Sequence, residues 1–336
     1  MSRLTQTFTA RPVSSGLILM AALVLFFAAW TLTAQQRNTP ATGQNEGSVQ
    51  VLPVQGSVYL IAGAGGNVVV QVGDETTLLV DTGAPGYSEQ IRAVLGRIAK
   101  RPVGFVLNTT IDKDHTGGNE ALSNGGVYML TSANQQRAQS AILSHLNLLN
   151  RLTDGDGKAL GIASNSFPTD TFDTDSWRLS ANGEAVILEH PEAAHTDSDM
   201  TVFFRRSDVI VAGDLFDMTR YPVIDEKRGG SLNGILKTLN HLSLDVAVPK
   251  QNEEGGTYIV PGHGRICDRY DIAVYRDMLT IIRDRIQDLV KKGQTIEQVK
   301  AAKPTYDYDG EYGAESGPWT TNMFVEAVYR ELKRGK

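Results

Sequence analysis

The sequence has almost no cysteine and no excess of positive charge. Cys267 is the only cysteine among 336 residues, which excludes a disulfide within the chain. The formal net charge is -6, and no basic patch with interleaved aromatic residues is present. Because phosphate backbones are bound by basic surfaces, this balance argues against a nucleic-acid partner. Cys267 is expected to be a small buried side chain at the start of a helix rather than a metal ligand.

Long apolar runs are also scarce, and the one that stands out lies near the N-terminus. Leu17 to Trp30 is almost uninterrupted, follows Arg3 and Arg11 without any acidic residue, and precedes small residues up to Ala34. This pattern predicts a signal peptide over residues 1–34, or an uncleaved membrane anchor through residues 17–34. Residues 35–48 are polar and predict a flexible linker. We therefore expect a periplasmic or secreted protein, or one anchored to the membrane.

The rest of the composition is that of a globular enzyme, with 41% hydrophobic and 21% charged residues. Apolar periodicity predicts alternating strands and helices. The predicted strands are Ser57–Ala62, Asn67–Val72, Thr76–Val80, Val103–Leu107, Val127–Leu130, Trp177–Ser180, Ala185–Leu188, Met200–Arg205, Val209–Ala212, Asp245–Val248 and Tyr258–Val260. The predicted helices are Tyr87–Lys100, Glu120–Ser123, Ala133–Leu152, Leu232–Leu242, Tyr270–Lys292, a short one beginning near Thr295, and Asn322–Arg334.

The most informative segment runs from Asn108 to Asn119 and reads NTTIDKDHTGGN. It follows an apolar strand and holds Asp112, Asp114 and His115 within four residues. Burying acidic and imidazole groups is costly unless something pairs with them, and a divalent cation would do so. Three further polar residues, His195, Asp214 and His263, each lie beside an apolar run, where loops gather at one edge of a sheet. Imidazole and carboxylate are metal ligands, so the sequence predicts a metal site.

In order and spacing these segments resemble the metallo-β-lactamase-fold superfamily, over roughly Val51 to Arg265. The family pattern is H-x-H-x-D-H, then a histidine, a bridging Asp or Cys, and a final histidine. The resemblance places Asp114 and His115 in the first motif, His195 as the next histidine, Asp214 as the bridging acid and His263 as the last ligand. The stretches LVDTG at 79–83 and TGGN at 116–119 are also similar to the family's.

Two sheets built from the predicted strands, with the predicted helices on their outer faces, would make a four-layer αββα sandwich of the α/β class, as the resemblance also implies. The domain would cover residues 49–265, and residues 266–336 would form a C-terminal helical extension packed on it. Its metal ligands would lie in loops on one edge, bind one or two ions and act on a small-molecule substrate.

The first motif departs from the family pattern at two places. Thr110 and Asp112 occupy the positions of its first two histidines. The first metal position would then consist of Asp112 and His195 with Asp214 shared, and it is either empty, weak, or selective for iron or manganese. The second metal position, with Asp114, His115, His263 and the shared Asp214, is complete, so at least one ion is expected there. Zinc is the leading candidate for the ion.

Three polar residues are expected to support the ligands rather than bind the ion. Asp81 is predicted to orient a histidine through a hydrogen bond. Asp199 is predicted to hold loop backbone or the surroundings of His195. Thr110, a neutral hydroxyl, would hydrogen-bond a water or a ligand.

The leading functional hypothesis is an exported hydrolase in which metal-bound water attacks an ester, lactone, lactam, thioester, phosphorus or sulfur centre. Asp114 would orient that water as well as bind the ion. Two rivals stay open: an iron-dependent redox or oxygen-handling protein, favoured by Asp112, and a non-catalytic binding protein, favoured by Thr110. The sequence names neither the substrate nor the oligomeric state.

Overall fold

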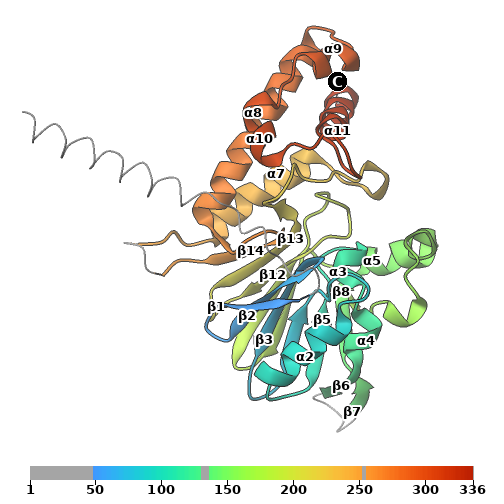
Figure 1. Cartoon of the computed structure of the whole chain (residues 1–336), viewed down its shortest axis with the longest axis vertical. Coiled ribbons are helices and arrows are strands. Elements are labelled where there is room, and N and C mark those ends of the chain that lie inside the picture. The colour runs from blue at the N-terminus through green and yellow to red at the C-terminus, as the bar shows by residue number, and fades with distance from the viewer. Residues whose placement is uncertain (1–47, 130–135, 252–254, 336) are drawn as a thin grey trace, which may run out of the picture. The chain divides into compact units, whose positions relative to one another are not determined.

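The computed structural model describes residues 48–129, 136–251 and 255–335. The predicted signal peptide or anchor, and the predicted linker apart from Ser48, lie outside these residues. Within these ranges, no helix combines the length and the apolar character that a membrane span requires. Two large sheets form the centre of the described chain (Figure 1).

The first sheet has seven strands in the order β1-β2-β3-β4-β5-β8-β9. They are β1 (Gln50–Gln55), β2 (Val58–Ala64), β3 (Gly66–Val72), β4 (Thr77–Val80), β5 (Val103–Leu107), β8 (Ala141–His145) and β9 (Asp170–Phe172). The first four strands pair antiparallel, whereas β4, β5, β8 and β9 run parallel to one another. The carboxyl ends of β4 and β5 therefore meet at one edge, where the loop of residues 108–119 begins.

The second sheet has six strands in the order β10-β11-β12-β13-β14-β15. They are β10 (Ser176–Ala181), β11 (Glu184–Glu189), β12 (Thr201–Phe204), β13 (Val209–Asp217), β14 (Tyr258–His263) and β15 (Cys267–Asp268). Only β13 and β14 pair in parallel, which brings Asp214 on one strand and His263 on the other to the same edge. A separate two-stranded sheet pairs β6 (Asn124–Met129) with β7 (Gln136–Gln139).

Strict alternation along the strands divides the apolar side chains between three cores. Val69 and Val80 point into the core between the two sheets, whereas Val68, Val70 and Leu79 point to the outer face of the first sheet. On that face they pack against α2 (Ser88–Ile98) and α4 (Asn119–Ser123). On the second sheet, Val209 and Val211 face the inter-sheet core, and Ile210 and Ala212 face the outer core. Successive strand residues point to opposite faces, so these strands are buried on both sides.

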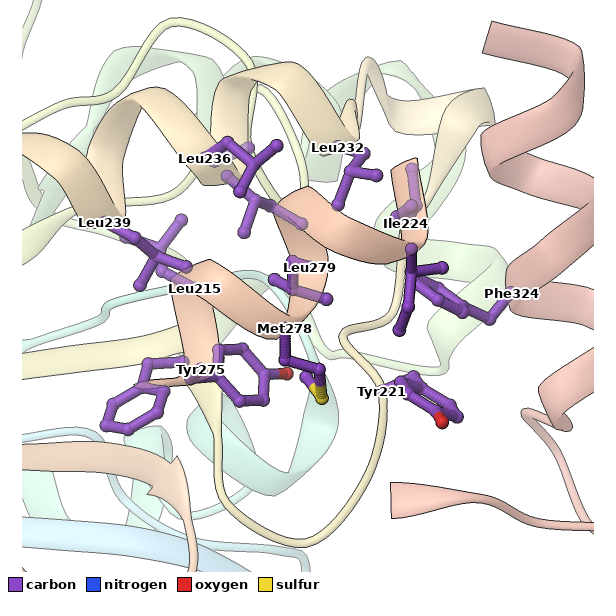
Figure 2. Close-up of a cluster of buried hydrophobic side chains, with 14 of the residues drawn as sticks. Leu215, Tyr221, Ile224, Leu232, Leu236, Leu239, Tyr275, Met278, Leu279 and Phe324 are labelled. Atoms are coloured by element: carbon purple, nitrogen blue, oxygen red, sulfur yellow. The ribbon is translucent and has the colours of Figure 1, made fainter. Parts of the chain in front are cut away.

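The outer face of the second sheet is covered by α7 (Leu232–His241) and by the C-terminal helices (Figure 2). Those helices are α8 (Arg269–Lys291), α9 (Ile296–Ala301), α10 (Asp309–Tyr312) and α11 (Thr321–Arg334). A reciprocal capping box between Asp268 and Asp271 starts α8. Tyr275, Met278 and Leu279 of α8 contribute to the same core as Leu215 of β13. The layer order is helix, sheet, sheet, helix, so the predicted αββα sandwich with C-terminal helices is confirmed. The domain boundary at residue 265 stays a prediction.

Two predicted elements are wrong. The helix over Ala133–Leu152 is mostly strand in its described part, which contains β7 and β8, and helix begins only with α5 (Leu146–Arg151). Ala141 to Leu143 is apolar on consecutive residues because a central parallel strand is buried on both faces, and such a run does not distinguish strand from helix. In the predicted strand Asp245–Val248, the first two residues end a helical turn, η4 (Leu242–Val246), that continues α7, and the last two have no regular structure. Leu244 and Val248 are exposed.

The remaining short helical elements lie around the loops. They are α3 (Lys113–Thr116), η1 (Leu152–Asp156), α6 (Gly157–Leu160), η2 (Ser164–Ser166), η3 (Glu226–Arg228) and η5 (Tyr306–Tyr308). Cys267 lies in the short strand β15 rather than at a helix start, and it is buried. Burial and the nearby Asp271 raise the pKa of its thiol to about 12, so it stays protonated at neutral pH.

Candidate metal centre

The loop after β5 is folded so that two of its predicted ligands lie in the short helix α3. Asp112 is the residue before this helix, and Asp114 and His115 lie within it. Thr82 holds the helix from the neighbouring β4 end, since its backbone N–H and its hydroxyl both donate to the His115 carbonyl, at 2.8 and 3.0 Å. The two glycines that follow are required by space, because a Cβ on Gly117 would overlap Pro85 and one on Gly118 would lie 2.5 Å from the Thr82 carbonyl oxygen.

Four side chains from three separate segments, α3, β13 and β14, converge at the second metal position. His115 Nε2 lies 3.1 Å from Asp214 Oδ1, and His263 Nε2 lies 3.5 Å from the same oxygen and 3.2 Å from Asp114 Oδ2. His115 is fully buried, Asp214 and His263 are each 12% exposed, and Asp114 is 34% exposed. The structure therefore brings together the four residues predicted for this position, with Asp114 at the solvent side.

The donor set fits a divalent cation. His263 Nε2 is buried and makes no hydrogen bond within the described chain, although carboxylate oxygens lie on two sides of it. Burial opposes charge at all four residues, yet the carboxylates raise the pKa of His115 and His263, and the histidines lower the pKa of Asp114 and Asp214. Two imidazole nitrogens and two carboxylates around one point are the ligands expected for zinc or another first-row metal.

Asp81 holds His115 in place from behind. Its Oδ2 lies 2.8 Å from His115 Nδ1 and accepts the Thr109 hydroxyl at 2.6 Å, and its Oδ1 accepts the Thr109 backbone N–H at 2.7 Å. Asp81 adopts a positive φ of 63°, which Asp tolerates better than most residues, and this conformation turns the carboxylate toward the loop. A proton on Nδ1 leaves Nε2 free to bind a cation, which is how such carboxylates act in metal sites.

Two residues that were not predicted as ligands position the segments that carry Asp214 and His263. Asn67, on β3 of the first sheet, donates to the carbonyls of Pro261 and Gly264 at 2.9 and 3.0 Å, on either side of His263. Gly213, with φ of 57°, interrupts the regular pairing of β13 just before Asp214. A Cβ there would come within 2.6 Å of the Thr109 hydroxyl. Sequence reasoning did not find Asn67, since a lone polar residue in an apolar strand carries no local signal.

The first metal position contains Asp112, His195 and Asp214. His195 Nε2 lies 3.4 Å from Asp112 Oδ2, and one donor atom from each of the three residues lies within 4.8 Å of the others. Asp199 and Thr110 lie on the other side of the ring, with Asp199 Oδ1 at 3.4 Å and Thr110 Oγ1 at 3.3 Å from His195 Nδ1. Burial disfavours a charged His195, but Asp199 and Asp112 raise its pKa to about 10.

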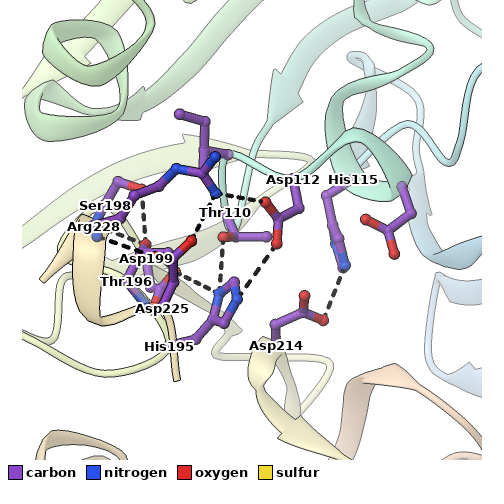
Figure 3. A network of polar contacts seen from close by, with 12 residues as sticks. Thr110, Asp112, His115, His195, Thr196, Ser198, Asp199, Asp214, Asp225 and Arg228 are labelled. Carbon is purple, nitrogen blue, oxygen red and sulfur yellow. Dashed lines mark hydrogen bonds and ion pairs between the residues drawn. The ribbon is translucent and has the colours of Figure 1, made fainter. Parts of the chain in front are cut away.

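Arg228 is the residue at this position that the sequence did not reveal. Its Nη1 lies 3.3 Å from Asp112 Oδ1 and 3.0 Å from Asp225 Oδ2 (Figure 3). Its Nε lies 3.3 Å from Asp156 Oδ2. The side chain is only 16% exposed. Asp112 is therefore not a free ligand, because one of its oxygens is already paired with a guanidinium.

Solved structures share this arrangement of sheets and helices. The chain superposes on a metallo-β-lactamase from Pontibacter korlensis with a TM-score of 0.53 and 17% identity, covering 69% of this chain and 99% of that one. The DIM-1 metallo-β-lactamase gives 0.51 and 13%, covering 69% and 97%. The chain has the metallo-β-lactamase fold. No protein-family model matches the sequence, and no curated protein matches it.

The same fold is found in a longer enzyme that matches more of this chain. The stereoselective inverting sec-alkylsulfatase Pisa1 from Pseudomonas sp. gives a TM-score of 0.60 and 15% identity over 84% of this chain. This chain spans 50% of the length of that protein. The matched share of 84% is larger than the share of the chain that residues 1–265 make up. The likeness therefore extends beyond the metallo-β-lactamase fold into the C-terminal helices.

Proposed function

We propose that the chain is an exported metal-dependent hydrolase that acts on a small molecule. The observation that carries this proposal is the convergence of Asp114, His115, Asp214 and His263, with a buried His263 nitrogen that has no hydrogen-bond partner in the described chain. A divalent cation held by these residues would supply a water molecule that ionises near neutral pH. Zinc suits the ligand set best, with iron or manganese as the other candidates.

The protein's own residues would orient the reaction. Asp114 is the most exposed of the four, and its Oδ2 faces His263, which leaves Oδ1 to accept a proton from an attacking water. Asp81 keeps the His115 proton on Nδ1, away from the ion. Export rests on the apolar run of residues 17–30, and N-terminal sequencing of protein from the periplasmic, membrane and medium fractions tests it.

Among hydrolytic reactions, cleavage of a sulfate ester is the first to test. The likeness to the sec-alkylsulfatase extends past residue 265, whereas each β-lactamase match covers a smaller share of the chain. The assay loads the purified protein with zinc, manganese or ferrous iron and supplies secondary alkyl sulfates, carboxylic esters, lactones and a chromogenic cephalosporin.

We expect turnover of at least one substrate class, and a loss of more than about a hundredfold in metal affinity and activity for H263A. Metal-loaded protein without turnover on the whole panel would favour the non-catalytic alternative. Iron bound in preference to zinc, together with oxygen consumption, would favour the redox alternative. The ion pair between Asp112 and Arg228 weakens the redox alternative, because the carboxylate that would distinguish an iron site is already paired with a guanidinium.

A further inference from the structure

The guanidinium of Arg228 lies directly beside Asp112 of the first metal position. Three carboxylates surround it, those of Asp112, Asp156 and Asp225, at 3.3, 3.3 and 3.0 Å. Of these three carboxylates, that of Asp112 also forms an ion pair with the His195 ring, with Oδ2 at 3.4 Å from Nε2 (Figure 3). The charge that a second ion would provide for Asp112 is thus already provided by the side chain.

The backbone of Arg228 is fixed as firmly as its side chain. Asp225 caps η3 by accepting the backbone N–H groups of Lys227 and Arg228 at 3.1 and 3.2 Å. The Arg228 carbonyl accepts the backbone N–H of Asp197 at 2.8 Å, in the loop that carries His195. An arginine held at both ends has little freedom to move away when a cation approaches.

We propose that Arg228 serves as an internal cation at the first metal position, so that the chain binds one metal ion, at the second position. A divalent ion ligated by Asp112 Oδ2 would lie close to the guanidinium on Oδ1, and the two positive charges would repel each other in a buried, weakly screened site. Thr110 adds no ligand charge in compensation. The inference rests on the proposed metal centre and specifies its stoichiometry.

The test counts ions per chain by elemental analysis after equilibration with zinc and removal of free metal. We expect one ion for the wild type and two for R228M, which keeps side-chain length but removes the charge. Affinity at the first position should rise about tenfold or more in that variant, or ~1.4 kcal/mol or more. The double variant R228M/D112N should return to one ion, because the new site depends on Asp112.

Arg151 offers a matched control in the same region. It pairs with both oxygens of Asp197, at 3.0 and 2.6 Å, and no contact with Asp112 is found among the described residues. R151M should keep one ion per chain. R228K, which keeps the positive charge, should do the same. If R151M also gained an ion, general loosening of the loops rather than the charge of Arg228 would explain the result, and the proposal would be wrong.

Other outcomes separate this inference from the proposed function. Two ions in the wild type, or one ion in folded R228M, would overturn the role of Arg228 while leaving the hydrolase proposal intact. No ion in the wild type would overturn the metal centre itself and the inference with it. If R228M does not fold, D112N in the wild-type background decides: it should retain its ion, and loss of the ion would show that Asp112 is a ligand.

Discussion

The sharpest test of the second metal position is a change of one atom in Asp81. D81N keeps the shape of the side chain, and asparagine tolerates the positive φ of this residue. It retains one acceptor for the Thr109 backbone N–H but places an amide NH₂ where Oδ2 now faces Thr109 Oγ1 at 2.6 Å and His115 Nδ1 at 2.8 Å. His115 Nδ1 must then accept a hydrogen bond, so the ring proton moves to Nε2.

That proton would occupy the atom expected to bind the ion, since His115 Nε2 is the one that lies 3.1 Å from Asp214 Oδ1. Loss of such a supporting carboxylate lowers metal affinity by about 10- to 100-fold in other metal sites. We expect D81N to weaken zinc binding by a factor in this range, measured by competition with a chromophoric chelator. Circular dichroism and thermal unfolding of the metal-free protein verify that the fold persists.

Asp199 supplies the matched control, because it is equally buried and contacts the Nδ1 of the other buried ligand candidate, His195. If the first position holds no ion, D199N should leave zinc affinity unchanged within about twofold, even though one of the two oxygens that accept hydrogen bonds from Thr196 becomes an amide donor. Equal zinc affinity for D81N and the wild type would refute the assignment of His115 as a ligand through Nε2.

Two further predictions concern glycine packing and acid stability. A Cβ on Gly262 would overlap Asp214 Oδ1, so G262A should displace the shared carboxylate and lower zinc affinity about tenfold or more, whereas G96A, on an open face of α2, should not change it. Burial and the stacked His190 lower the pKa of His145 to about 4. Between about pH 6.5 and 4 the imidazole is therefore protonated in the unfolded chain but not in the folded one, so the free energy of unfolding decreases as the pH is lowered through this range. His145 caps α5 by accepting the Asn147 backbone N–H at 3.3 Å, and asparagine can take over this cap. H145N should therefore flatten the slope by at most about 1.4 kcal/mol per pH unit in urea unfolding, and an unchanged slope would contradict the lowered pKa.

The sandwich could be predicted because its strands obey simple rules. Val68, Val69 and Val70 show no alternation, but three successive β-branched residues beside the glycines at 65 and 66 favour a strand, and the structure divides them between two cores. The prediction was wrong at β8, where Ala141, Ile142 and Leu143 are buried on both faces of a central strand and show no alternation. A short run of this kind becomes a strand only because β5 and β9 flank it.

The candidate ligands were accessible from sequence because metal chemistry restricts the donors to a few residue types, and Asp112, Asp114 and His115 fall within one short loop. Asp81 was predicted to orient a histidine, and the structure places it on His115. Which nitrogen it contacts, and hence which one faces the ion, depends on the path of the loop around α3 and carries no sequence signal.

The sequence by itself indicated the class of fold, the residue types that could hold a metal ion, and the departure from the family pattern at Thr110 and Asp112. Only the tertiary structure decided what lies at that position instead. Arg228 is 116 residues from Asp112, and Asn67 is 197 residues from Gly264. Contacts over such separations arise from the packing of two sheets and the loops at their shared edge, and arginine and asparagine are too common on surfaces for their sequence neighbours to reveal them.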